Sequence, residues 1–303
     1  MTTERQGHLF DLDEAGDPEV ARSLLDQLLA DAKLYTTSDS YKELLDAVVR
    51  LRNVAPFNGM LLQLQKPKVT YVASAYDWKT RLNRLVKEDA RPLLILWPFG
   101  PVATVYDVLD TYDPKNPSAE GPPAYLASFL AAGPITKERV LSFEGLLRKT
   151  NIELRWVDRG DASAGEIRVV NPATKGEPIG YVVKLNRNHT PAVQFSTLAH
   201  ELAHLCLGHL GQNRKLKIPS RRALRRSEVE IEAESVAYLV SERNGIRVES
   251  QSYLSHFVES GIGVDRLDLY QIMRAAGQVE KLLELTAHTQ FDRHKRGGSG
   301  KTE

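Results

Sequence analysis

The feature that most constrains this chain is a pair of histidines four residues apart, with a glutamate beside the first. His200, Glu201 and His204 occupy these positions. Thr190 and Pro191 precede them and are a good helix start, because threonine caps a helix N-terminus and proline fits its first position. Residues one turn apart share a helix face, so both imidazoles can reach one ion. The motif therefore predicts a metal site on a helix.

Glu201 gives the predicted metal site a means of catalysis. Zinc lowers the pKa of its bound water to near neutrality, so a hydroxide nucleophile exists at neutral pH. A carboxylate beside the first ligand can take the proton from that water. Catalytic zinc sites use three protein ligands plus water, so His200 and His204 require one more ligand. Zn2+ is the cofactor that this pattern predicts.

Four glutamates that follow on an expected helix over 228–243 are candidates for the third ligand: Glu228, Glu230, Glu232 and Glu234. At about 100° per residue they fall on two stripes. Glu230 and Glu234 share their stripe with two alanines, which permit close helix packing. Glu228 and Glu232 share a more polar stripe, which is typical of a solvated face. We therefore predict Glu230 as the ligand and Glu234 as the carboxylate that holds a histidine N–H.

The composition is that of a globular protein of a reducing, aqueous compartment. Hydrophobic residues make up 42%, charged residues 26%, and the formal net charge is +1, which gives no global field for nucleic acid or membranes. No run approaches the roughly 20 apolar residues of a membrane span, and the first 20 residues lack the apolar core of a signal peptide. The one cysteine, Cys206, excludes an intramolecular disulfide. We expect a cytoplasmic protein with no membrane partner.

Apolar periodicity and turn residues predict an α+β fold. In the first half we expect helices at 20–29, from 38 or 39 to 55, at 57–65 and at 76–86, with strands at 69–73, 93–97 and 102–108. The last two strands read as a hairpin. In the second half we expect helices at 137–149, 190–209, 228–243, 250–260 and 264–286, with strands at 153–157, 166–170 and 180–185.

A stretch rich in proline, glycine, alanine and serine at 111–135 marks the predicted domain boundary. The expected order is a disordered N-terminus over 1–17, a first domain over 18–115, a linker over 116–135, a second domain over 136–290 with the metal site, and a disordered tail over 291–303.

Aromatic and basic side chains alternate in the first half. Single-strand binders stack aromatic rings on bases and place cations on phosphates. This pattern suggests single-stranded DNA as a partner, with Trp78 as the stacking residue and four cations beside it: Lys79, Arg81, Arg84 and Lys87. The alternative is that Trp97 and Tyr106, which lie in strand-like runs, belong to the core and that the lysines are an ordinary surface. Trp97 lies in an apolar run and is expected in the core.

Three further features lie near the predicted metal site. A basic segment over 214–226 separates the second histidine from the third ligand, and we interpret it as a solvated loop, with an acidic substrate or DNA as the alternative ligand. Cys206 lies about 200° around the helix from His204 and is expected to be buried. His209 is expected to pack or cap at the helix end, with a contact to a metal ligand as the alternative.

The segment from Leu198 to His209, followed by the one from Glu230 to Val240, resembles the ImmA/IrrE family of zinc metallopeptidases. That family has the same pair of histidines and, on a later helix, a glutamate three residues before an alanine. The resemblance covers roughly residues 150–245. It implies a zincin-like fold, zinc, peptide hydrolysis and Glu230 as the third ligand.

The first half resembles the N-terminal domain of ArdC-type antirestriction proteins. The resemblance rests on Phe57-Asn-Gly-Met-Leu-Leu62, Tyr76-Asp-Trp78, Val86-Lys-Glu88 and Leu93-Leu-Ile-Leu-Trp97. It implies a domain that binds single-stranded DNA, joined to a zincin domain.

The sequence therefore predicts a zinc-dependent peptidase with a protein or peptide substrate, which could act as a regulatory protease or in connection with DNA. The alternative is a single-stranded-DNA-binding protein of the antirestriction type in which the metal is accessory. The two hypotheses differ in whether Glu201 is required.

Overall fold

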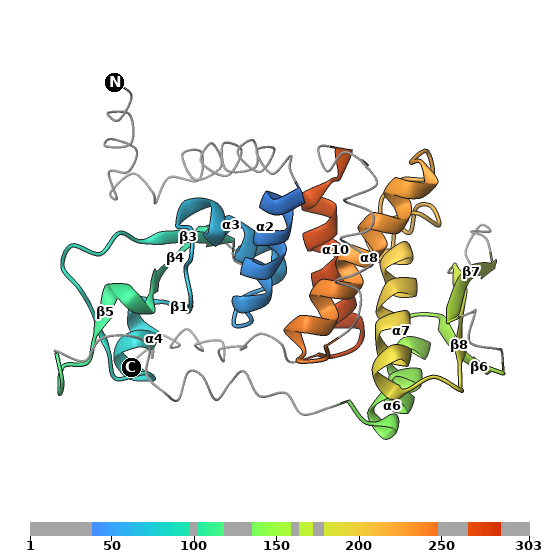
Figure 1. Ribbon diagram of the computed structural model, residues 1–303, viewed down its shortest axis with the longest axis horizontal. Helices are drawn as coiled ribbons and strands as arrows, with labels where there is room; N and C mark the ends of the chain where they lie inside the picture. The colour runs from blue at the N-terminus through green and yellow to red at the C-terminus, as the bar shows by residue number, and fades with distance from the viewer. Residues whose placement is uncertain are drawn as a thin grey trace, which may run out of the picture.

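The computed structural model describes residues 38–96, 102–117, 135–158, 164–171, 179–247 and 266–285. Helices and small sheets are mixed in this part, so the fold is α+β as predicted (Figure 1). Among the described residues, none of the helices is long and apolar enough to cross a membrane. The helices expected at 20–29 and 250–260, both chain ends and most of the expected linker lie outside the described residues.

A three-stranded sheet and two helices form one end of the structure. The strands are β6 (Ile152–Val157), β7 (Gly165–Asn171) and β8 (Gly180–Asn186). Their order is β6-β8-β7, with β6 parallel and β7 antiparallel to the central β8. Helices α6 (Lys137–Arg148) and α7 (Pro191–Cys206) lie on one side of this sheet (Figure 1).

Helix α7 starts as the sequence predicts. The Thr190 side chain accepts a hydrogen bond from the backbone N–H of Val193, and proline takes the first helical position. The predicted end near His209 is wrong by three residues, because the helix ends at Cys206. Gly208 has φ of +82° and turns the chain, and a Cβ there would lie 2.0 Å from the carbonyl oxygen of Pro219.

Helices α8 (Arg226–Arg243) and α10 (Leu269–Leu282) complete the core around α7. The prediction that Glu228 and Glu232 share a solvated stripe is wrong. Both are buried, together with Ser235 on the same helix. The reason is tertiary, since α2 and α10 cover that side of α8. The Tyr41 hydroxyl of α2 donates to Ser235 Oγ at 2.6 Å.

Two helices of the first half belong to this core. They are α2 (Ser38–Arg50) and α3 (Pro56–Gln65). Leu44 and Met60 lie in the same buried apolar cluster as Phe195 of α7. Apolar side chains of both halves are therefore removed from water together, and the two halves stabilise each other through this burial.

The rest of the first half forms a small mixed lobe. Its three-stranded sheet has the order β1-β4-β3, formed by β1 (Val72–Ala73), β3 (Leu93–Leu96) and β4 (Val102–Asp107). Strands β3 and β4 pair antiparallel, as the predicted hairpin requires. The lobe also holds α4 (Ala75–Thr80), η3 (Val108–Asp110) and the pair β2 (Leu85–Val86) and β5 (Thr111–Tyr112). The helix expected over 76–86 ends at Thr80, because the chain turns to form β2.

A buried ion pair joins α2, α8 and α10. Arg243 is fully buried and donates to Glu280 Oε1 at 2.8 Å. It also donates to the backbone carbonyls of Val48, Leu51 and Val54 at the end of α2. A buried guanidinium with this many acceptors fixes the chain that leaves α2.

We predict that Arg243→Met lowers the free energy of unfolding by about 3–5 kcal/mol, because it takes the cationic partner from a buried carboxylate. Urea unfolding of the full chain is the measurement. Arg148→Met is the matched control, since Arg148 pairs with Glu144 on the surface of α6 and its loss should change stability little. Equal stabilities of the two variants would contradict the prediction.

Candidate metal centre

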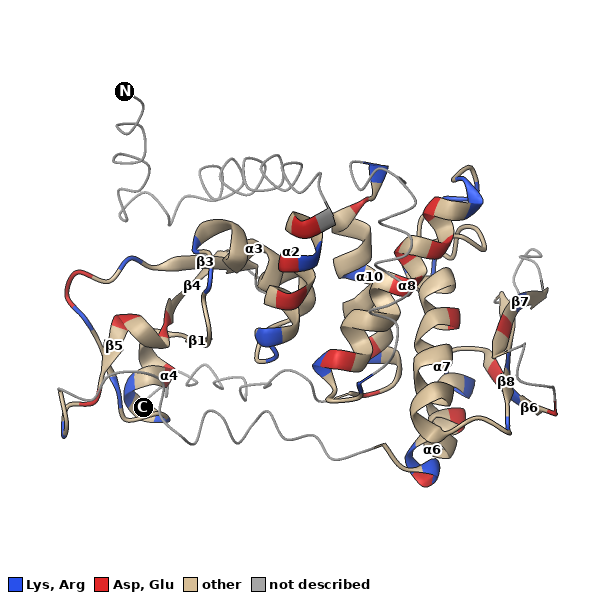
Figure 2. Ribbon diagram, in the orientation of Figure 1, with Lys and Arg blue, Asp and Glu red and all other residues tan. Residues whose placement is uncertain are grey.

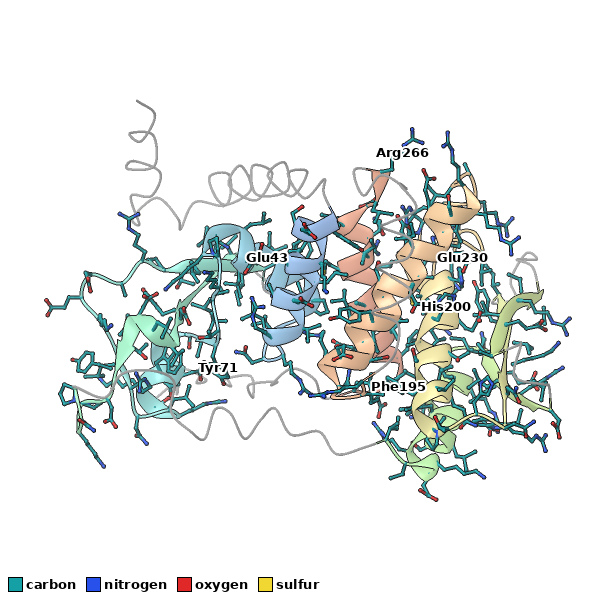
Figure 3. The ribbon with its side chains drawn as sticks, in the orientation of Figure 1. Glu43, Tyr71, Phe195, His200, Glu230 and Arg266 are labelled. Atoms are coloured by element: carbon teal, nitrogen blue, oxygen red, sulfur yellow. The ribbon has the colours of Figure 1, made fainter. Side chains whose placement is uncertain are left out.

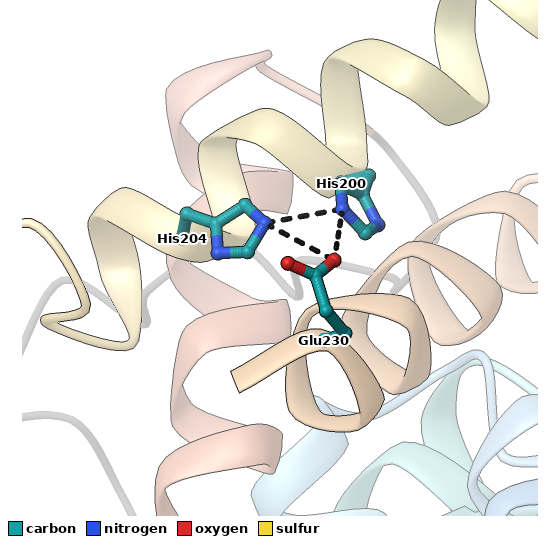
Figure 4. Close-up of side chains that lie close together, drawn as sticks. All are labelled: His200, His204 and Glu230. Carbon is teal, nitrogen blue, oxygen red and sulfur yellow. Dashed lines mark hydrogen bonds and ion pairs between the residues drawn. The ribbon is translucent and has the colours of Figure 1, made fainter. Parts of the chain in front are cut away.

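Three side chains from α7 and α8 converge on one point (Figure 4). His200 Nε2 lies 3.1 Å from His204 Nε2. Glu230 Oε2 lies 3.5 Å from the first of these nitrogens and 3.9 Å from the second. Ligand atoms about 2.0–2.1 Å from one tetrahedral ion are separated from one another by about 3.3 Å. The three atoms are therefore spaced as a single zinc-sized ion requires.

Close packing of α7 and α8 produces this convergence. Ala199 and Ala203 of α7 and Ala233 and Ala237 of α8 are all fully buried. Small side chains allow two helix backbones to approach, so a glutamate in the first turns of α8 can reach the histidine face of α7. Figure 3 labels His200 on α7 and Glu230 on α8, and Figure 4 shows the two side chains close together. The structure thus brings together the three residues that the sequence predicts as ligands.

Glu234 lies where the helical spacing predicts. Its Oε2 is 3.0 Å from His200 Nδ1, the ring nitrogen away from the convergence point. An ionised carboxylate can only accept a hydrogen bond, so Nδ1 carries the proton. In the neutral ring His200 Nε2 then keeps its lone pair, which is the form that binds a metal.

Glu201 lies against the sheet rather than among the three candidate ligands. Burial raises the pKa of the Glu201 carboxyl to about 7, although the charge of His200 acts to lower it. The backbone of Ile167 in β7 forms a hydrogen bond with this carboxyl. Gly165 of β7 leaves room for α7 to lie this close to the sheet, because a Cβ there would lie 2.5 Å from Thr197 Cγ2 and 3.4 Å from Glu201 Cγ. A carboxyl group with a pKa near neutrality can both accept and return a proton at physiological pH.

The two imidazoles differ in charge in the absence of metal. Burial lowers the pKa of His200, but hydrogen bonds to Glu230 and Glu234 outweigh it and raise the pKa to about 10. Burial and the neighbouring imidazoles of His200 and His209 lower the pKa of His204 to about 3. The hydrogen bond with His200 also lowers the pKa of Glu230. The metal-free site therefore holds a proton on His200, between two carboxylates.

A second set of buried groups lies beside His204, and it realises the alternative expected for His209, a contact with a metal ligand. His209 Nδ1 lies 3.0 Å from His204 Nδ1, and His209 Nε2 lies 3.1 Å from Glu232 Oε2. Arg221 donates to both oxygens of Glu232, at 2.6 and 2.7 Å. The basic segment over 214–226 is thus not simply a solvated loop, since one of its arginines holds a buried carboxylate. Cys206 is buried, as predicted.

The prediction that Trp78 stacks on bases is wrong for the folded protein. Its side chain is fully buried, and its Nε1 donates to the carbonyl of Tyr106 at 2.9 Å. Its ring packs edge-on against Tyr71, with centroids 5.7 Å apart. Helix α4 buries this face against the sheet of the small lobe, so the tryptophan is a core residue. Trp97, which the sequence places in the core, lies outside the described residues.

The four cations predicted to bind DNA have different environments. Arg84 is buried and donates to the side chain and carbonyl of Thr111, which ties β2 to β5, so it is not available for a phosphate contact. Arg81 pairs with Asp77 at 3.1 Å. Lys79 is exposed. Lys87 is also exposed and donates to the carbonyl of Leu109.

Comparisons with known proteins find matches to both kinds of protein that the sequence resemblances name. Residues 161–251 match the family model of the IrrE N-terminal-like domain, Peptidase_M78, and the resemblance of the second half is confirmed there. Two solved structures of the antirestriction ArdC protein from plasmid R388 also match. The Mn(II)-bound one is 16% identical, with a TM-score of 0.39, and covers 91% of this chain and 97% of its own.

The metal-free ArdC structure is 15% identical, with a TM-score of 0.37, and covers 91% of this chain and 96% of its own. The curated proteins give no match.

We predict that zinc binding at pH 7 releases a proton from His200, because a metal ligand must be neutral and the pKa of this imidazolium is about 10. Protons compete with the metal, so zinc affinity should rise with pH up to about 10. Calorimetric titrations in two buffers of different protonation enthalpy measure the release. Heats that do not depend on the buffer would contradict it.

Proposed function

We propose that this protein is a metal-dependent peptidase. His200, His204 and Glu230 hold a divalent ion, for which zinc is the first choice, and Glu201 is the catalytic base. The observation that carries the proposal is the convergence of two imidazole nitrogens and one carboxylate oxygen on a single point. The match of residues 161–251 to Peptidase_M78 supports it independently of this geometry. The site residues, the choice of zinc and a cytoplasmic location all belong to this proposal.

A bound divalent ion would polarise the scissile carbonyl and lower the pKa of a water molecule. Glu201 would take a proton from that water and deliver it to the amine that leaves. Its pKa of about 7 suits both steps, because the carboxylate and the acid have similar free energies at neutral pH. Glu234 meanwhile keeps the His200 ring in the orientation that points Nε2 at the site.

Strand β7 is the place where we expect the peptide substrate to bind. Among the described strands, β7 pairs with β8 on one side and forms the edge of its sheet. Its residue Ile167 contacts Glu201 through the backbone, so the edge strand borders the catalytic base. An extended peptide that adds to such an edge gains main-chain hydrogen bonds and lies beside the candidate metal centre.

Glu201→Gln tests the catalytic role. The amide has the shape of the carboxyl group but cannot take a proton, so hydrolysis should fall by about 100-fold or more while zinc stays bound. Cleavage of a fluorescence-quenched peptide library is measured beside the zinc content of each protein. Glu153→Gln, on the exposed face of β6, is the matched control and should keep full activity. Undiminished cleavage by Glu201→Gln would refute the assigned role.

A second candidate function is the binding of single-stranded DNA by the small lobe, with the metal site accessory. Figure 2 shows acidic and basic residues interspersed over the described elements, in keeping with the net charge of +1. The observation that favours this candidate is local. Tyr76 of α4 is 55% exposed, and the exposed Lys79 follows it at helical spacing. An exposed aromatic ring beside a cation is a stacking platform of the kind that single-strand binders use.

On this second proposal Tyr76 takes the stacking role that the sequence assigned to Trp78. Tyr76→Ala should weaken the binding of a fluorescein-labelled oligo-dT by about 5- to 150-fold, which corresponds to the loss of one stacked base. Fluorescence anisotropy of the full chain at low salt measures the affinity. Tyr270→Ala, at a tyrosine of α10 that is 41% exposed, is the control. Absence of binding by the unsubstituted chain, or equal affinity of both variants, would exclude this function.

A further inference from the structure

We propose that His209 and Glu232 are positioning residues for His204, which fix the tautomer in which His204 offers Nε2 to the metal. The proposal rests on the proposed metal site and adds the part of the protein that prepares the second histidine. Neither residue touches the point where the three candidate ligands converge. They act through the ring of His204 alone.

Consecutive hydrogen bonds link His204 at the proposed metal site to Arg221, through His209 and Glu232. His204 Nδ1 meets His209 Nδ1 at 3.0 Å, and His209 Nε2 meets Glu232 Oε2 at 3.1 Å. Arg221 donates to both oxygens of Glu232, in the two-pronged geometry that suits a guanidinium and a carboxylate. The backbone N–H of Asp268 donates to Glu232 Oε1 at 3.2 Å.

The Glu232 carboxylate determines which atom is the donor in each hydrogen bond that links it to His204. Arg221 keeps Glu232 ionised, so Glu232 can only accept and His209 Nε2 must carry a proton. With the proton on Nε2, the His209 ring has Nδ1 as its acceptor, which faces His204. The hydrogen bond between the two rings then needs its proton on His204 Nδ1. His204 Nε2 keeps its lone pair, which faces the proposed metal site. The opposite direction would put a proton on His204 Nε2 and block metal binding.

Each of the two candidate histidine ligands is thus oriented by a carboxylate, directly in one case and through a second imidazole in the other. His200 donates directly to the carboxylate of Glu234. His204 reaches the carboxylate of Glu232 through the ring of His209. Metal-binding histidines commonly hold a carboxylate in this way, since the partner fixes the tautomer and the orientation of the ring.

The backbone at Gly208 brings the residues of this hydrogen-bond network together. Gly208 turns the chain after α7 and places His209 back beside His204. Its carbonyl accepts a hydrogen bond from the N–H of Arg221 at 2.9 Å, which brings the basic segment to the same place. Glu232 has no exposed surface, and a buried carboxylate is retained only where charged and polar partners satisfy it.

Two variants of the full chain separate positioning from simple packing. His209→Asn keeps an amide oxygen near the place of Nδ1, so it can still accept from His204. His209→Gln carries its amide near the place of Nε2, so it can meet Glu232 but offers no acceptor to His204. The two side chains are equally polar and differ by one methylene. Competition with a chromophoric chelator gives the Zn2+ affinity, and urea unfolding gives the stability of each metal-free protein.

We expect His209→Gln to weaken zinc affinity by about 10- to 100-fold and His209→Asn to retain most of it. The absorption spectrum of the Co2+-loaded protein should change in the glutamine variant and stay close to that of the unsubstituted chain in the asparagine variant. Equal zinc affinities of the two variants, at comparable stability without metal, would overturn the positioning role. Failure of the unsubstituted chain to bind zinc would instead overturn the proposed metal site, so the two failures are distinguishable.

Discussion

The close approach of α7 and α8 is the constraint on which the rest of the structure depends. Alanines on both helices let the backbones come near enough for Glu230 to face His200 and His204. A larger side chain at Ala203 or Ala237 would separate the helices and move the carboxylate away from the imidazoles. Helix α2 from the first half and helix α10 from the second half cover α8 and hold it in place.

Burying so many ionisable groups is costly, and the structure offsets the cost by pairing them. Glu232 meets Arg221 and His209, and Glu280 meets Arg243, all inside the helical core. Such pairs contribute less to stability than apolar packing of the same volume would, but breaking one leaves a buried charge without its partner. Their value here is geometric, since each pair ties together segments that are distant in the sequence and so fixes the surroundings of the site.

Local patterns in the sequence were sufficient to predict which three side chains converge, but not what surrounds them. Thr190 and Pro191 predict the start of α7, and helical spacing selects Glu230 and Glu234, because these signals lie within one element. The burial of Glu232 and Trp78 was missed, since it depends on which elements cover α8 and α4. The contact of His209 with His204 was predicted only as the alternative, for the same reason. The domain boundary at 116–135 stays a prediction, and the core shared by α2, α3 and α7 shows that sequence order alone does not separate the two halves.

The central claim is that His200, His204 and Glu230 bind one metal ion. X-ray absorption at the zinc edge of the zinc-loaded protein tests it most directly. We predict two imidazole nitrogens at about 2.0–2.1 Å and light oxygen ligands at about 2.0–2.2 Å, in four-coordinate geometry. In the Glu230→Ala protein one oxygen ligand should be replaced or lost while both imidazoles remain. A zinc site without imidazole ligands, or one that His200→Ala and His204→Ala leave unchanged, would contradict the account.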